Sequence, residues 1–306
     1  MISKNKIYKA IYNPNLILRK VWQKSSRLIK NDKIYLSVNF FLSHKKKMHW
    51  DNPKTFNEKT TWLKLWSKNK GFEKYVDKYE VRKFIAEKIG EEYLVPIYGV
   101  WDSYDDIDFR SLPDKYVLKT THDSGGVKII TGQPTESTRK FFTRHMASNY
   151  FLKGREYPYK KVAPRIMAEK FMVDESCGDL KDYKFFCFNG EPRILFLASE
   201  RFKDKNKKAK FDYFDIDRKK LPFESFGHES LYKPGDVLPD IPEYDEMLRI
   251  AKILSTGFPF IRIDFYNING KIYVGEMTFF HDDGVVPFSP KEWDYRLGEM
   301  ITLPES

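Results

Sequence analysis

Apolar and polar residues follow one another along this chain with two different periods, which predict helices mixed with antiparallel strands. Apolar side chains recur at helical spacing in residues 52–66, 77–90, 137–152 and 243–256. Runs rich in β-branched and aromatic residues predict strands within residues 93–101, 115–121, 165–172, 182–198 and 260–280. The polar stretch 201–220 is expected to form a loop. This order of elements favours an α+β fold over a doubly wound parallel sheet.

The N-terminal segment 15–31 has the pattern of a basic amphipathic helix. Leu18, Val21, Trp22, Leu28 and Ile29 lie on one face, and most of its lysines and arginines lie off that face. Such a helix fits the surface of an anionic membrane, and it fits equally well a helix packed on a folded body with its lysines in water. Both interpretations stay open at the level of the sequence.

Two Asn-Gly pairs divide the strand-rich stretches into hairpins. Asn189-Gly190 lies between two halves of residues 182–198, and Asn269-Gly270 lies within residues 260–280. The pair Asn-Gly is the preferred two-residue hairpin turn because both positions accept a positive φ.

The second hairpin carries the strongest candidate chemistry. Arg262 and Asp264 share a face of its first strand, and Glu276 and Thr278 share a face of its second. Two carboxylates on paired strands suit Mg²⁺, which prefers oxygen ligands shared with phosphates. A two-residue turn would pair residue 264 with residue 275, so Asp264 and Glu276 meet only if the turn has three residues or a bulge intervenes.

The charge of the chain is concentrated in two segments. The 306 residues include 54 Lys+Arg and 43 Asp+Glu, a formal net charge of +11. Residues 1–31 contain eight basic residues and no acid, and the segment KDKNKKAK at 203–210 contains five lysines and one aspartate. The rest of the chain is close to neutral, which argues against a broad nucleic-acid-binding surface.

Several classes of protein are disfavoured by what the sequence lacks. No apolar run approaches the ~18 residues of a membrane span, and the N-terminus has no signal-peptide pattern, so we expect a cytoplasmic protein. Cys177 and Cys187 have no matching cysteine or histidine cluster and are expected to be reduced thiols. Neither a Walker A motif nor G-x-G-x-x-G occurs.

A different phosphate-binding pattern is present in YVLKTTHDSGGVKII at 116–130. Lys119 ends a predicted strand, and the glycine-bearing turn His122–Gly126 follows it. A lysine supplies a positive charge to phosphates, and glycines let backbone amides approach phosphate oxygens. By itself the pattern is also that of a hairpin turn beside an exposed lysine.

Seven ordered blocks together resemble the ATP-grasp superfamily, and more closely its TupA-like group, which is found with polysaccharide biosynthesis. The blocks are NPKTFNEKTTWLKLW, DKYEVRKFIAEKIGEEYLVP, LPDKYVLKTTHDSGG, PRIMAEKF, DYKFFCFNGEPRIL, FPFIRIDFYNINGKIYVGEMTFF and LGEMITLP. The resemblance implies an ATP-grasp fold, in which two α+β subdomains enclose ATP. We therefore expect a basic helical segment at 1–50 and an ATP-grasp domain at 51–306, with subdomains at roughly 51–110, 111–175 and 176–306.

The resemblance also implies roles for individual residues. Lys78 and Lys119 would contact the nucleotide phosphates, and a glycine-rich lid and an adenine-binding hinge would complete the nucleotide site. Lys184 and Arg262 would be catalytic, facing the transferred phosphoryl group. The lid would consist of Ser124, Gly125 and Gly126; the hinge of Glu169, Lys170, Phe171 and Met172; and the Mg²⁺ ligands of Asp264, Glu276 and Thr278, the last standing where many relatives have asparagine.

The chemistry implied by the family is the ATP-dependent joining of a carboxylate to an amine through an acyl phosphate. The TupA-like group points to a uronic-acid carboxyl of a cell-surface polysaccharide and to an amino acid or small amine, with residues 1–31 as a peripheral membrane contact. One alternative is a kinase or glycosyltransferase of polysaccharide biosynthesis, for which Asp215-Ile216-Asp217 supplies a D-x-D pattern. A second alternative is a non-catalytic basic module that binds nucleic acid or membrane.

Overall fold

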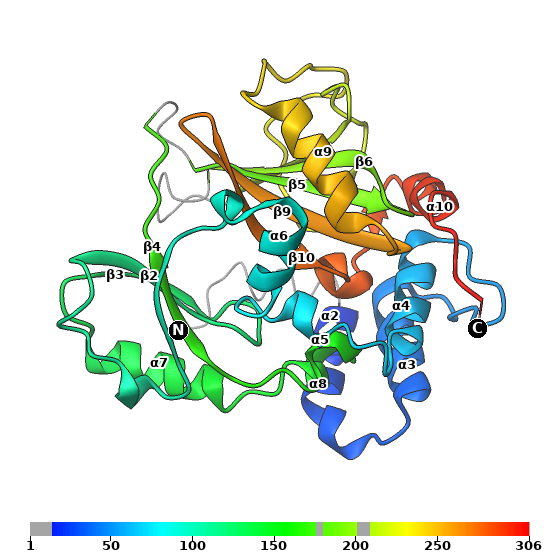
Figure 1. Cartoon of the computed structure of the whole chain (residues 1–306). Helices are drawn as coiled ribbons and strands as arrows, with labels where there is room; N and C mark the ends of the chain where they lie inside the picture. The colour runs from blue at the N-terminus through cyan, green and yellow to red at the C-terminus, as the bar shows by residue number, and fades with distance from the viewer. Residues whose placement is uncertain (1–13, 176–179, 201–208, 306) are drawn as a thin grey trace.

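The computed structural model describes residues 14–175, 180–200 and 209–305. Most of the predicted elements are present, and they form two antiparallel sheets with helices around them (Figure 1). The α+β prediction is therefore confirmed. The helices are α2 (Pro14–Lys24), α3 (Asp32–His44), α4 (Phe56–Trp66), α5 (Glu73–Val76), α6 (Val81–Ile89), α7 (Glu136–Met146), α8 (Phe151–Gly154), α9 (Tyr244–Ser255) and α10 (Glu292–Glu299), with short 3-10 turns at Ser25–Leu28, Glu91–Tyr93, Tyr104–Asp106, Tyr157–Tyr159 and His281–Gly284.

The smaller sheet has four strands in the order β1-β4-β2-β3. These strands are β1 (Ile97–Trp101), β2 (Lys115–Thr120), β3 (Val127–Thr131) and β4 (Ile166–Lys170). Along β2, Tyr116, Leu118 and Thr120 are buried on one face, where Tyr116 and Leu118 share an apolar cluster with Phe142 of α7. Val117 and Lys119 lie on the opposite face of β2, which lines the cavity described below. Strand β1 of this smaller sheet lies within the predicted subdomain 51–110.

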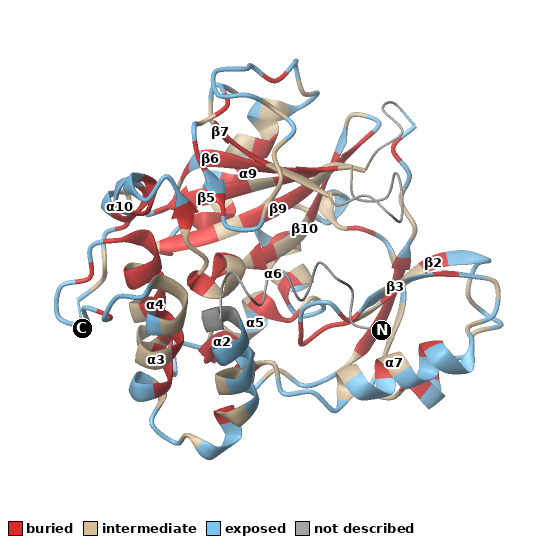
Figure 2. Cartoon of the chain, turned by 180° about the vertical axis from the view of Figure 1, so that it is seen from behind, coloured by how far each residue is buried: buried red, intermediate tan, exposed pale blue. Residues whose placement is uncertain are grey.

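The larger sheet has five strands in the order β10-β9-β5-β6-β7, and every pair is antiparallel. The strands are β5 (Asp182–Phe188), β6 (Glu191–Ser199), β7 (Lys210–Asp215), β9 (Phe260–Ile268) and β10 (Lys271–Thr278), and a small separate pair joins β8 (Glu224–Ser225) to β11 (Phe288–Ser289). Helix α9 packs on one face of the larger sheet (Figure 1). In the view coloured by burial these strands are largely buried (Figure 2).

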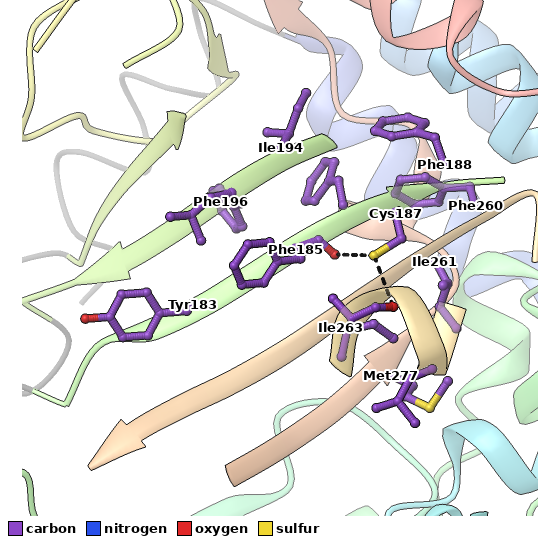
Figure 3. Packing of buried hydrophobic residues seen from close by; sticks show 14 of the residues in the cluster. Tyr183, Phe185, Cys187, Phe188, Ile194, Phe196, Phe260, Ile261, Ile263 and Met277 are labelled. Carbon is purple, nitrogen blue, oxygen red and sulfur yellow. Dashed lines mark hydrogen bonds between the residues drawn. The ribbon is translucent and has the colours of Figure 1, made fainter. Parts of the chain in front are cut away.

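One face of β5 packs against α9. Tyr183, Phe185 and Cys187 point to the α9 side, where the Cys187 thiol lies 3.8 Å from the Ala251 carbonyl oxygen (Figure 3). Burial raises the pKa of the Cys187 thiol to about 12, so this cysteine is an inert free thiol. Cys177 lies outside the described residues.

Local sequence signals account for several helix ends. Thr55 is the N-cap of α4, and the Thr55 hydroxyl and the Glu58 carboxylate form a reciprocal capping box. Gly90 follows α6 with a φ of 111°, as expected of a C-terminal stop. Helix α6 begins at Val81, later than the start of the predicted segment 77–90.

Two predictions were wrong. Residues 137–152 form α7 and the separate turn α8 instead of one helix. The loop predicted for 201–220 contains β7, whose pairing with β6 buries Asp212, Tyr213 and Phe214. Most of the KDKNKKAK segment, 203–208, lies outside the described residues.

The amphipathic segment 15–31 is helical to Lys24 and continues as a 3-10 turn. Its predicted apolar face is divided, because Trp22 turns inward and stacks on Tyr35 while Leu18, Val21 and Leu28 are exposed. The Arg19 guanidinium lies 2.6 Å from the Asp283 carboxylate. The helix is thus joined to the body of the molecule. No helix among the described residues is long and apolar enough to span a membrane.

Candidate functional site

A cavity of about 720 Å³ lies between the small sheet and the β9–β10 edge of the large sheet. It brings together eleven of the fourteen residues predicted for the site from segments far apart in the sequence. These are Lys78, Lys119, Ser124, Gly125, Glu169, Lys170, Phe171, Met172, Lys184, Asp264 and Glu276. Gly126, Arg262 and Thr278 stand behind this wall.

Lys119 projects into the cavity from β2. Its ammonium lies 2.7 Å from the Glu169 carboxylate of the neighbouring strand β4. The register pairs Val117 with Glu169 and Lys119 with Met167, so the lysine and the glutamate are diagonal neighbours on one face of the sheet. The ion pair holds the ammonium in place before any ligand arrives.

Lys78 reaches the same cavity from the turn before α6. Its backbone amide donates to the Thr121 carbonyl, and its ammonium donates to the Asp123 carbonyl at 2.5 Å. Burial lowers the pKa of Lys78, and the nearby Lys119 ammonium lowers it further, while Glu276 and Asp123 act in the opposite direction. The ammonium groups of Lys78 and Lys119 are close enough to repel each other. A bound anion would offset this repulsion, so the site favours anion binding.

The turn between β2 and β3 separates exposed from buried residues. Ser124 and Gly125 are exposed on the cavity wall, and Gly125 has a φ of 91°. Gly126 is buried, and a Cβ at this position would lie 1.8 Å from the Thr120 hydroxyl. This glycine is therefore required by packing, and it contributes no surface to the cavity.

Asp123 points away from the cavity. Its carboxylate accepts a hydrogen bond from the Thr120 hydroxyl and lies 2.5 Å from Nδ1 of His145 on α7. His122, next to it, makes a 3.1 Å contact with the His145 carbonyl. These bonds fix the shape of the turn and leave its open side to Ser124 and Gly125.

Lys184 of β5 and Asp264 of β9 line the opposite wall, and Arg262 lies behind them. The Arg262 guanidinium contacts both oxygens of Asp264, at 2.6 and 2.8 Å, and the Lys184 ammonium lies 2.5 Å from the same carboxylate. Burial alone would raise the pKa of Asp264, but the positive charges of Arg262 and Lys184 lower it to about 2. Asp264 is therefore ionised at any physiological pH.

The β9–β10 hairpin contains a β-bulge, one of the arrangements that the sequence allowed. Lys271 pairs with Ile268, so the turn has two residues, and the register shifts between Val274 and Glu276. The extra residue is Gly275, and beyond it Glu276 stands opposite Asp264. The condition that the sequence left open is met by a bulge.

Thr278 stands behind the two carboxylates. Its hydroxyl accepts a hydrogen bond from Nη2 of Arg262 at 3.1 Å. Because this oxygen is already engaged by a guanidinium, the position supports Arg262 directly. A role of Thr278 as a metal ligand stays a prediction.

His281 holds the other side of Arg262. Nδ1 of His281 lies 3.0 Å from Nη1 of Arg262, and its Nε2 lies 3.1 Å from the Tyr213 hydroxyl. Burial lowers the pKa of His281 to about 3, so its ring is neutral and Nδ1 is an acceptor for the guanidinium. Asp264, Thr278 and His281 together determine the orientation of Arg262.

Asp264 and Glu276 have the chemistry of a magnesium site. Mg²⁺ is usually held by one or two carboxylates, with substrate phosphates supplying further oxygens. Two carboxylates that face each other across a bulged strand pair fit this description. No group of three or more histidine, cysteine, aspartate or glutamate residues suited to a metal occurs among the described residues, so the pair would depend on phosphate oxygens.

Part of the cavity wall is apolar, although Lys128, Lys170 and Asp174 also line the cavity. The predicted hinge, Glu169–Met172, contributes Phe171 and Met172 to the wall, and Val117, Val127 and Ile129 face them from the small sheet. Val127 and Ile129 are exposed although they are apolar. The base of a nucleotide is apolar and its phosphates are charged. A cavity with an apolar slot beside a cluster of lysines therefore suits a nucleotide.

The family model for TupA-like ATP-grasp proteins matches residues 58–302. The chain belongs to the TupA-like ATP-grasp family. Its α+β fold is therefore the ATP-grasp fold, with the cavity between its two sheets. A search of curated proteins found no match.

Solved structures similar to this TupA-like protein are distant in sequence. The D-alanine–D-alanine ligase of Bacillus anthracis in complex with ATP is 14% identical, with a TM-score of 0.36, over 74% of this chain and 57% of that one. The Helicobacter pylori D-alanine–D-alanine ligase is 13% identical, with a TM-score of 0.40, over 76% and 59%. The N5-carboxyaminoimidazole ribonucleotide synthetase of Thermus thermophilus is 10% identical, with a TM-score of 0.35, over 67% and 45%.

Asp182 is one of several cavity residues of this TupA-like protein that were not predicted from the sequence. Asp182 lines the cavity, and its carboxylate lies 3.0 Å from the Lys184 ammonium. The spacing of Asp182 and Lys184 on one strand gave a usable signal, because residues i and i+2 share a face. The approach of His281 to Arg262 had no such local signal.

Proposed function

We propose that this protein is an ATP-dependent ligase that joins a carboxylate to an amine and releases ADP and phosphate. The observation that carries the proposal is the cavity with an apolar slot at one end and Lys78, Lys119 and the Asp264–Glu276 pair at the other. The described part of its wall contains neither cysteine nor histidine. Chemistry by positioning and charge, without a covalent protein intermediate, suits this set of residues.

In the proposed reaction the hinge and the apolar slot hold the adenine, and Lys78 and Lys119 contact the phosphates. An oxygen of the substrate carboxylate attacks the γ-phosphorus, the bond to the β-phosphate oxygen breaks, and ADP leaves. The amine then attacks the acyl carbon, phosphate leaves, and the proton that the amine loses passes to the departing phosphate or to water. Arg262 and Lys184 would stabilise the negative charge that develops on the transferred phosphoryl group.

Magnesium would be held by Asp264 and Glu276. When bound it would neutralise charge on the β- and γ-phosphates. Arg262 and Lys184 already contact Asp264, so this carboxylate would hold both the metal and the two cationic groups in one arrangement. The chain thereby keeps its cationic groups oriented toward the phosphates.

The proposed substrates are a uronic-acid carboxyl of a polysaccharide or its precursor and an amino acid or small amine. Family membership supports this choice, because the sequence pattern of the TupA-like group is associated with polysaccharide biosynthesis. A kinase that phosphorylates a hydroxyl would use the same nucleotide site. The D-x-D pattern that favoured a glycosyltransferase does not line the cavity, and the Asp215 carboxylate accepts a hydrogen bond from the Lys219 amide in a turn.

A peripheral contact with a membrane is proposed for the N-terminal helices. Apolar side chains are exposed on the outer side of this region, and Leu28 is 84% exposed. Lysines and arginines surround them, which suits an anionic lipid surface. The exposed set is Ile17, Leu18, Val21, Leu28, Ile34 and Phe41.

The reaction is tested by supplying ATP, Mg²⁺ and a panel of uronic acids with hydroxylamine in place of the amine. We expect ADP and a stable hydroxamate, because hydroxylamine captures an acyl phosphate. A wild-type protein that released AMP would contradict the proposal, and ADP formed without any hydroxamate would favour the kinase. The Lys83→Ala protein, whose substitution lies on the exposed side of α6, is the surface control and should form the same products as wild type.

The membrane contact is tested by sedimentation with vesicles of phosphatidylglycerol and phosphatidylcholine. Point substitutions suit this test better than a deletion, since Arg19 and Trp22 are bonded into the body. We expect wild type to sediment with the anionic vesicles and the Val21→Ser/Leu28→Ser protein to stay in solution. Equal sedimentation of both proteins would contradict the assignment.

A further inference from the structure

A second hollow lies on the outer side of α4, away from the nucleotide cavity. Its volume is about 860 Å³, and it shares no lining residue with the cavity. Three of the six tryptophans of the chain line it, together with three lysines and the C-terminal residues 303–305. We refer to this surface as the tryptophan groove: Lys33, Trp50, Asp51, Pro53, Trp62, Leu65, Trp66, Lys68, Lys70, Leu303, Pro304 and Glu305.

The indole rings of the groove are held firmly. The Trp50 indole N–H donates to the Ser37 hydroxyl at 2.9 Å, and Trp66 packs against Phe72 with 5.8 Å between ring centroids. Trp62 packs against the cores on both sides of α4. All three tryptophans are half-buried, so each is anchored and still presents surface. Large aromatic groups fixed in this way are typical of a binding surface.

The lysines stand over these rings. The Lys33 ammonium lies 5.4 Å from the Trp50 ring centroid, and the Lys70 ammonium lies 4.8 Å from the Trp66 ring centroid. Lys33, Lys68 and Lys70 are exposed. A ligand ring that stacked on the same face would displace the ammonium of the exposed lysine to the edge of the indole, within reach of the substituents of the ligand ring.

We propose that the tryptophan groove binds an acidic saccharide, by stacking of sugar rings on tryptophan and by pairing of uronate carboxylates with lysine. The flat faces of a pyranose ring carry C–H groups that suit indole, while its hydroxyls and carboxylates suit polar side chains. This inference rests on the proposed function in one respect, since the saccharide belongs to the class proposed for the catalytic carboxylate.

The charge of the groove favours a saccharide over a nucleic acid. Asp51 and Glu305 lie among the three lysines, so the excess of positive charge is small. The phosphate backbone of a nucleic acid carries one charge per nucleotide and is repelled by carboxylates. A uronate chain also carries one charge per residue, but each of its rings has hydroxyl groups that can donate to carboxylates such as those of Asp51 and Glu305.

The groove also lies near the end of the catalytic hairpin. Trp66 contacts Phe72, and Phe72 stacks on Phe279 with 5.0 Å between ring centroids. Phe279 directly follows β10, the strand that carries Glu276. In Figure 1 the C-terminus, α3 and α4 lie together on the side of the molecule away from the small sheet. A saccharide held in the groove would thus be bound outside the nucleotide cavity but beside the catalytic part of the fold.

The test is the binding of tetragalacturonate, measured by titration calorimetry and by tryptophan fluorescence without ATP. We expect saturable binding to wild type and a loss of affinity of at least about tenfold in Lys68→Glu/Lys70→Glu. The matched control, Lys83→Glu/Lys140→Glu, has the same change in net charge at side chains that are 82% and 77% exposed elsewhere. Its affinity should stay within about twofold of wild type.

Three outcomes would overturn the inference: absence of saturable binding, an equal loss in both double variants, or equally tight binding of maltotetraose or of an octathymidylate. Failure of the proposed function is seen separately, because it concerns ATP consumption with a monomeric uronate. The Lys68→Glu/Lys70→Glu protein should retain that consumption, since neither lysine lines the nucleotide cavity.

Discussion

One face of the large sheet has different chemistry at its two ends. At one end Asp182 and Lys184 of β5 line the cavity with Asp264 of β9. At the other end of the same two strands the positions are taken by aromatic residues. Phe186, Phe188 and Phe260 pack there around Phe56 of α4, with ring centroids 4.8–6.4 Å from it.

One strand pair therefore serves both stability and chemistry. The aromatic end is held by burial and ring packing, which require no particular charge. The charged end is buried as well, and each of its charges has an opposite charge beside it. Removal of an aromatic side chain should therefore cost stability, while removal of a charged side chain should cost activity.

Phe260→Ala is expected to have the largest effect on stability. Phe260 is 2% exposed and contacts three other aromatic rings, so its removal leaves a cavity and should lower the free energy of unfolding by roughly 3–5 kcal/mol. Urea unfolding measures this value. Phe226→Ala, at a half-exposed ring, is the control and should change it by less than about 0.5 kcal/mol. Equal losses in both would contradict the importance of the aromatic end.

Glu276→Ala is expected to reduce ATP turnover by a factor of roughly 10²–10³, because it removes one of the two carboxylates proposed to hold Mg²⁺. Its unfolding midpoint should stay close to that of wild type. Turnover is measured as ADP release per folded molecule, with Glu87→Ala as the control for an exposed glutamate. Normal turnover in Glu276→Ala would mean that the charged end is not the catalytic one.

His281 joins the two ends, since its ring contacts Phe186 at 4.7 Å between centroids and its Nδ1 accepts from Arg262. Folded His281 stays neutral down to about pH 3, whereas the same residue in the unfolded chain takes up a proton below about pH 6.5. The stability contribution is therefore complete above pH 6.5 and is lost as the pH falls toward 3. The loss from this one residue is about 1.4 kcal/mol per pH unit.

His281→Asn should remove this contribution. The free energy of unfolding of the variant, measured between pH 6.5 and pH 4.5, should fall less steeply than that of wild type by about 1.4 kcal/mol per pH unit. Burial also lowers the pKa of His44, to about 4, so part of the wild-type slope should remain in the variant. Identical slopes in the two proteins would show that His281 is not held neutral.

Lys83→Ala is expected to have the smallest effect. Its ammonium lies 4.0 Å from the Glu87 carboxylate on the exposed side of α6, and both side chains are largely in water. Its removal should change the unfolding free energy by less than about 0.5 kcal/mol and leave turnover unaltered. A larger change would indicate that surface charge contributes more than the buried pairs suggest.

The hairpin at 260–280 shows what sequence could and could not predict. The turn at Asn269-Gly270 and the alternation of side chains between the two faces of β9 could be predicted, because both depend on local residue preferences. The bulge at Gly275 was one of two options that the sequence allowed. Choosing between them requires the packing of both strands, which a local pattern does not contain.

Other parts of the fold gave weaker signals. Strand β7 follows a lysine-rich stretch, and its sequence KFDYFD mixes acids with aromatics, so it read as a loop. Its pairing with β6 and the burial of Asp212 decide its conformation, and both are long-range. Of the fourteen residues predicted for the site, in contrast, eleven line the cavity, since most of the fourteen belong to the sequence blocks of the family.

The most direct test of the central claim is calorimetric titration of Mg·ATP into wild type and into Lys119→Ala. We expect one binding site in wild type and an affinity at least about tenfold lower in the variant, because Lys119 would supply a positive charge to the phosphates from the cavity wall. The Lys83→Ala protein should bind like wild type. Unchanged affinity in Lys119→Ala, with its fold intact, would contradict the assignment of this cavity to the nucleotide.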